Sequence, residues 1–99
     1  MINIEWSIEA IKDFEHNIEY LKNNFAESIV QRFIDKTMEI IQVISINPLA
    51  FQTTVYRNIH SVPIVPQVNL YYRIVSKNKI ELVRFWNNYQ NPTGLDLRD

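Results

Sequence analysis

The chain has 99 residues, a formal net charge of −1, one glycine and no cysteine. The length suits a single domain spanning residues 1–99, and 46% hydrophobic with 21% charged residues is typical of a folded soluble domain. One glycine, Gly94, excludes glycine-rich phosphate loops, and the lack of cysteine excludes disulfides, thiol nucleophiles and cysteine-bound zinc.

The charge is divided unevenly along the chain. Residues 1–46 carry eight acids and four bases, a net −4, whereas residues 47–99 carry three acids and six bases, a net +3. Such an asymmetry is consistent with a basic face that meets an anionic partner, or with ordinary variation on a solvated surface.

The spacing of apolar residues near the N-terminus predicts a short strand followed by a helix. Ile2, Ile4 and Trp6 alternate with polar residues, which indicates a short strand with one buried face. Ser7 is a suitable N-cap for the helix that follows.

Acidic residues interrupt this terminus where a signal peptide would need an apolar core, and no apolar run reaches ~20 residues, so we expect a cytoplasmic protein without a membrane partner.

Two apolar stripes at helical spacing follow. The first runs from Ile8 to Phe25 and is expected to end near Asn23 and Asn24. The second starts at Ile29 and is closed by Asn47-Pro48, because a residue that precedes proline is disfavoured in the α region. The short joint between the two predicts an antiparallel helical hairpin.

The second half of the chain is predicted to form strands. Residues 57–65 are rich in β-formers but contain Pro63, which predicts an edge or an early end. Residues 68–76 and 79–86 form a hairpin through a polar turn, where Asn78 can take the left-handed conformation, and residues 87–99 form a partly irregular tail. We therefore predict an α+β fold of order β-α-α-β-β-β, with the helical hairpin on one face of a small antiparallel sheet. The opposite face is expected to be open or covered by a partner.

The histidines and carboxylates do not suggest a metal site. His16 and His60 lie far apart without carboxylates at ligand spacing, so we expect no metal and no cofactor. Arg73 and Arg84, on the two predicted hairpin strands, are better candidates, because guanidinium groups bind phosphates and stabilise a phosphorane in RNA cleavage. They can equally pair with acids or lie over the sheet edge.

The side of the sheet on which each arginine lies depends on register. Strict alternation places Arg84 with Ile80, Leu82 and Trp86, and Arg73 with Asn69 and Tyr71. The neighbouring aromatic residues can stack on bases, fill the core or form a partner interface; they are Tyr71, Tyr72, Phe85, Trp86 and Tyr89.

Several of these segments together resemble one family. The opening strand with WSIEAIKDFEHNIEYL (residues 6–21), the second helix ending at Asn47-Pro48, and VNLYYRIVSKNKIELVRFWNNYQNP (residues 68–92) resemble the RelE/ParE toxins of bacterial type II toxin–antitoxin systems. The likeness covers nearly the whole chain.

This resemblance implies a small cytoplasmic toxin that inhibits growth, stabilises plasmids and is neutralised by a cognate antitoxin in a hetero-oligomer. The family acts in two ways. RelE-like members are metal-independent endoribonucleases that cut mRNA on the ribosome, whereas ParE-like members inhibit DNA gyrase and are not nucleases.

The residues that match the family favour the ParE-like branch. Arg84 matches an arginine of the last strand, but Asn69 stands where an arginine often occurs and Trp86 where a histidine often occurs. We therefore predict a ParE-like inhibitor whose target contacts come from Arg84, Trp86, Asn88 and Gln90.

Two alternatives stay open. The first is a RelE-like ribonuclease in which Arg73 and Arg84 stabilise phosphate charge and Tyr89 or His60 does acid–base work. The second is an inactive toxin-fold protein that serves as a binding module.

Overall fold

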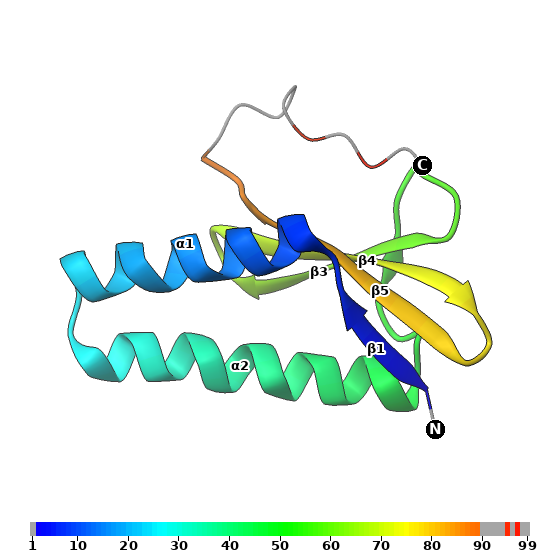
Figure 1. Ribbon diagram of the computed structural model, residues 1–99, viewed down its shortest axis with the longest axis horizontal. Helices are drawn as coiled ribbons and strands as arrows, with labels where there is room; N and C mark the ends of the chain where they lie inside the picture. Colours follow the sequence, from blue (N-terminus) through cyan, green and yellow to red (C-terminus); the bar gives the residue numbers. More distant parts are fainter. Residues whose placement is uncertain (1, 90–94, 96, 98–99) are drawn as a thin grey trace.

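The computed structural model describes residues 2–89, 95 and 97. Strand β1 (Asn3–Trp6) leads into helices α1 (Ile8–Asn24) and α2 (Glu27–Ile46), and the chain then forms β2 (Gln52–Thr53), β3 (Ile59–Val65), β4 (Val68–Ser76) and β5 (Lys79–Asn87). Both helices lie on the same side of the sheet (Figure 1). The predicted α+β fold is confirmed.

The sheet has five strands in the order β1-β5-β4-β3-β2. β1 runs parallel to β5 and the other pairs are antiparallel, so the sheet is mixed rather than wholly antiparallel. β2, which has only two residues and no apolar pattern, was not predicted. β1 and β2 form the two edges, and the β4–β5 hairpin lies inside the sheet.

The helix boundaries follow from local chemistry. Ser7 is the predicted N-cap of α1, since its Oγ accepts a hydrogen bond from the Ala10 N–H at 3.0 Å. α1 ends at Asn24, and α2 ends at Ile46, directly before Asn47-Pro48, as predicted. In the described part of the chain, no helix is long and apolar enough to cross a membrane.

The core lies between the helical hairpin and one sheet face. The strands contribute apolar residues such as Leu70, Ile80 and Leu82, each 0% exposed. At one end of this core, the rings of Trp6, Phe14, Phe33 and Phe85 form a chain of contacts with centroids 5.3–5.5 Å apart. Full burial of one such side chain is worth about 1.5–3 kcal/mol, so this layer fixes how α1 sits on β5.

The prediction for Pro63 is confirmed, whereas the left-handed turn residue differs from the one expected. β3 pairs with β2 only through His60 and Ser61, so Pro63 lies where β3 is an edge, as predicted. The left-handed residue is Asn58, with φ of 62°, and not Asn78. Asparagine tolerates this region better than most residues, and the Asn58 carbonyl there accepts from the Ile74 N–H at 2.9 Å.

Tyr72 is a buried tyrosine whose ionisation opposes folding. Its side chain is 0% exposed, and its hydroxyl donates to the Pro48 carbonyl at 2.6 Å. Burial raises the pKa of Tyr72 to about 12, because the phenolate would lose its hydration.

We expect the free energy of unfolding to fall as pH rises from 10 to 12, because the unfolded chain loses the Tyr72 proton first. A group whose pKa is higher in the folded state stabilises the fold fully at pH values below its unfolded pKa, which is about 10 for tyrosine. This stabilisation, about 2–3 kcal/mol for Tyr72, is lost as the pH rises toward the folded-state pKa. In urea unfolding at each pH, Tyr72→Phe should remove this part of the decline. Tyr20→Phe, at a 54% exposed position, is the control and should follow the wild type.

Candidate functional site

A β-bulge decides which sheet face carries Arg84. Tyr71 pairs with Arg84 and Tyr72 pairs with Leu82, so Val83 is an extra residue in β5. Beyond it the alternation is inverted: Phe85 joins the core, and Arg84 lies on the face away from the helices. The predicted grouping of Arg84 with Ile80 and Leu82 is therefore wrong, because strict alternation takes no account of an inserted residue.

Arg84 and Arg73 consequently share one face of the sheet. Arg73 pairs with Ile59 in β3 and with Glu81 in β5, and Tyr71 lies two residues away on the same side. The bulge thus brings together the two arginines that the ribonuclease interpretation requires. Their guanidinium groups, however, are held in different places.

The edge of β5 beyond Leu82 is capped by α1. β1 ends where Trp6 pairs with Leu82, and two side chains then replace it as hydrogen-bond partners of β5. Ser7 Oγ donates to the Val83 carbonyl at 2.8 Å, and Asp13 Oδ2 accepts from the Phe85 N–H at 3.1 Å. Asp13 therefore completes the backbone hydrogen bonding of β5, in addition to carrying a negative charge.

The same Asp13 carboxylate binds Arg84 in a bidentate pair. Arg84 Nε lies 2.7 Å from Oδ2 and Nη2 lies 3.0 Å from Oδ1, with the two side chains 22% and 18% exposed. These hydrogen bonds raise the pKa of Arg84 further, against the opposing effect of burial. The guanidinium carbon also lies 5.0 Å from the Trp86 ring centroid. Only the remaining N–H donors of Arg84 can bind a phosphate or a carbonyl.

Arg73 is held by the chain itself. Its Nη2 donates to the Leu97 carbonyl at 3.2 Å, and its Nε lies 3.7 Å from Glu81 Oε1. Leu97 is 2% exposed, so the chain returns to the sheet face that was expected to be open or covered by a partner. The sequence did not indicate this return, because Leu95 and Leu97 alone, in an otherwise polar tail, form too short a run to predict a packed segment.

The other predicted residues are spread over the molecule. Trp86 is buried beneath Arg84, with 9% of its surface exposed, and Asn88 donates its backbone N–H to the Gln67 carbonyl at 2.7 Å. Gln90 lies outside the described residues. His60 is 5% exposed, stacks on Tyr72, and has Nδ1 2.8 Å from the Phe51 carbonyl. It is therefore a packed histidine on the helix side, away from Arg73.

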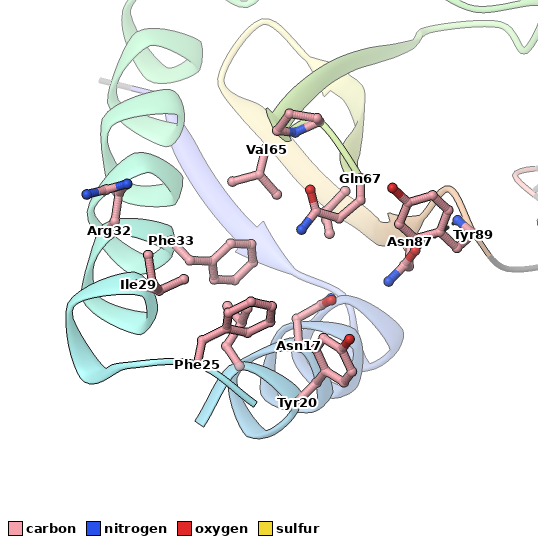
Figure 2. Close-up of a pocket in the computed structure, with 13 residues that line it drawn as sticks. Asn17, Tyr20, Phe25, Ile29, Arg32, Phe33, Val65, Gln67, Asn87 and Tyr89 are labelled. Atoms are coloured by element: carbon pink, nitrogen blue, oxygen red, sulfur yellow. Dashed lines mark hydrogen bonds between the residues drawn. The ribbon is translucent and has the colours of Figure 1, made fainter. Parts of the chain in front are cut away.

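Tyr89 is 88% exposed and lines a groove that the sequence did not indicate. This groove, of about 450 Å³, lies between the helix ends at the α1–α2 joint and the β3–β4 turn (Figure 2). A second groove of about 330 Å³ continues along α1 and shares three lining residues with the first, Asn17, Tyr20 and Asn87. We call the two together the end groove.

The described residues thus do not gather the three predicted catalytic side chains in one pocket. Arg73 contacts Leu97 on the outer sheet face, Arg84 is turned to Asp13 at the β5 edge, and Tyr89 belongs to the end groove. Among those residues there is also no cluster of three or more histidines and acids that could hold a metal ion.

The fold is that of known toxin–antitoxin structures. The chromosomal ParDE system of P. aeruginosa superposes with a TM-score of 0.71 at 12% identity, over 88% of this chain and 96% of that chain. The YoeB dimer of Staphylococcus aureus gives 0.62 at 20% identity over 89% and 98%, and the E. coli DinJ–YafQ complex gives 0.58 at 13% over 88% and 93%. No family model and no curated protein matches the sequence. The chain therefore has the fold of these ParDE, YoeB and YafQ structures, and the resemblance predicted from the sequence is confirmed at the level of the fold.

We expect Asp13→Ala to lower the free energy of unfolding by about 2–3 kcal/mol, because it leaves Arg84 unpaired and the Phe85 N–H without its acceptor. Arg84→Ala should cost less, since Asp13 keeps the Phe85 amide. In a double-mutant cycle by urea unfolding, the coupling energy should be about 1–2 kcal/mol. Additive effects of the two substitutions would contradict this account.

Proposed function

We propose that this chain is the toxin of a type II toxin–antitoxin system and that it acts, as ParE-like toxins do, by binding and inhibiting DNA gyrase. Two kinds of observation support the proposal: the superposition on ParE, YoeB and YafQ structures, and the resemblance of residues 6–21 and 68–92. Its partners would be a cognate antitoxin and the target, in the bacterial cytoplasm, with growth inhibition as the result and plasmid stabilisation as the role.

One observation carries the choice of inhibition over RNA cleavage. Asp13 binds Arg84 through two N–H donors and turns it toward α1. Tyr89 lines the end groove, whereas Arg73 contacts Leu97 on the outer sheet face. RNA cleavage without a metal needs phosphate-binding and acid–base groups around one phosphodiester. A binding surface does not need that convergence, so the arrangement favours an inhibitor.

A second function, ribosome-dependent mRNA cleavage, has one structural observation in its favour. The bulge at Val83 places Arg73 and Arg84 on the same sheet face, as two phosphate-binding arginines would require. YoeB and YafQ structures are also among those that superpose. Under this alternative Tyr89 would supply the acid–base group.

We expect the purified chain to block supercoiling of relaxed plasmid DNA by gyrase and to arrest growth when its expression is induced without the antitoxin. Arg84→Ala would impair both functions, because it also removes the Asp13 pair, so it serves only as a loss-of-function control. Growth arrest together with normal supercoiling at excess protein would reject the gyrase proposal. Harmless expression would favour an inactive toxin-fold module.

Tyr89→Phe separates the two mechanisms. The side chain is 88% exposed, so removal of its hydroxyl should leave stability within about 0.5 kcal/mol of the wild type. Inhibition of gyrase should persist, since no proton transfer is involved. If the chain is instead a ribonuclease, the variant should lose about 10²–10⁴-fold in cleavage, as expected for loss of a general acid or base. Mapping of mRNA 5′ ends after induction would measure that loss.

A further inference from the structure

The sheet face that is turned away from the helices contains a buried apolar residue. Both helices lie on the other side of the sheet (Figure 1). Val62 in β3 belongs to the core on that side, and Ile59 lies on the opposite face because side chains alternate along a strand. Ile59 is nevertheless only 1% exposed. A strand residue on a sheet face without helices is normally solvated, so its burial needs a cover from another part of the chain.

Leu97 is buried at the same place. It is 2% exposed and, like Ile59, lies outside the cluster that the helices cover. Its carbonyl accepts a hydrogen bond from Arg73 Nη2 at 3.2 Å, and Arg73 is the β4 residue that pairs with Ile59. The Arg73 side chain is 17% exposed, with Nε 3.7 Å from Glu81 Oε1. The end of the chain thus reaches the arginine that lies next to the buried isoleucine.

We propose that the C-terminal segment is an internal cover of this face. Leu97 seats over Ile59 and its backbone carbonyl occupies Arg73, so the end of the chain competes with anionic groups for that guanidinium. A carbonyl is a neutral acceptor, whereas a phosphate oxygen forms the stronger, charge-assisted hydrogen bond with arginine. The inference goes beyond the proposed function, because it holds for either mode of toxin action.

The forces that hold the cover closed are small. One apolar side chain and one hydrogen bond from Arg73 favour the closed state, and the conformational entropy of the chain end opposes it. These opposing contributions are similar in size, so both states are populated and Leu97 decides the balance. A cover that is closed about nine-tenths of the time weakens a competing ligand about tenfold, because only the open fraction binds.

Thiol labelling measures the opening. The chain has no cysteine, so one introduced thiol reports a single position. Ile59→Cys places it under the cover, whereas Val62→Cys, at a 3% exposed position of the same strand, places it under the helices. In the full-length chain, Leu97→Ser should speed maleimide labelling of the Ile59→Cys variant about tenfold and leave the Val62→Cys variant unchanged. Leu97→Met keeps an apolar anchor and should keep labelling slow.

Binding of an anionic probe measures the competition. In fluorescence anisotropy at low salt, Leu97→Ser should tighten the binding of labelled oligouridine by the same factor, within about twofold, because both measurements report the open fraction. Arg73→Gln in the Leu97→Ser background should abolish this gain. Leu49→Ser is the matched control: the side chain is 73% exposed, and its loss should change neither measurement.

Four results would overturn the inference. They are labelling of Ile59→Cys that Leu97→Ser leaves unchanged, equal acceleration at Ile59→Cys and Val62→Cys, faster labelling without tighter oligouridine binding, and a gain in binding that survives Arg73→Gln. Circular dichroism checks folding. If Leu97→Ser unfolds, Leu97→Ala replaces it and should give a smaller rise in both measurements.

The proposed function is tested separately, since none of these measurements uses gyrase or growth arrest. A chain that shows the cover but does not arrest growth rejects only the toxin proposal. A chain that inhibits gyrase without a cover at Leu97 rejects only this inference.

Discussion

The carboxylate of Asp13 holds together the part of the molecule on which the functional argument depends. β1 pairs with β5 only as far as Leu82, and the exposed edge beyond it would leave polar backbone groups without partners. Asp13 accepts the Phe85 N–H there and binds Arg84 from the same oxygen atom, while Ser7 accepts the Ala10 N–H and donates to Val83. Helix α1 thus supplies the hydrogen-bond partners that β5 lacks beyond Leu82, and its Asp13 neutralises Arg84. The N-cap of the same helix, Ser7, lies at this edge of β5.

This constraint shapes the electrostatics of both candidate surfaces. Because Asp13 turns Arg84 toward α1, the outer sheet face offers only part of that guanidinium, and Arg73 is engaged by Glu81 and Leu97. Because the same pair neutralises Asp13, that carboxylate does not offset the charge of Lys12, which lines the same groove along α1. The net charge of the chain conceals this arrangement.

Much of the fold could be predicted because its signals are local. Helix boundaries at Ser7 and Asn47-Pro48 depend on capping and on proline sterics, and both are confirmed. Less of the site could be predicted. The face of Arg84 depends on one inserted residue, Val83, whose placement is set by pairing with β4. The return of Leu97 to the sheet depends on a contact with Arg73, 24 positions away, which no local pattern specifies.

Apart from the two-residue strand β2, the sequence by itself determined the element types and their order. It also determined the division into an acidic helical half and a basic strand half, since periodicity, capping and charge are properties of neighbouring residues. Only the tertiary structure decided which side chains meet. The Asp13–Arg84 pair joins residues 71 positions apart, and the end groove is lined by residues from both helices and from β3 to beyond β5. Contacts of that range follow from strand register and packing, which no short stretch of sequence specifies.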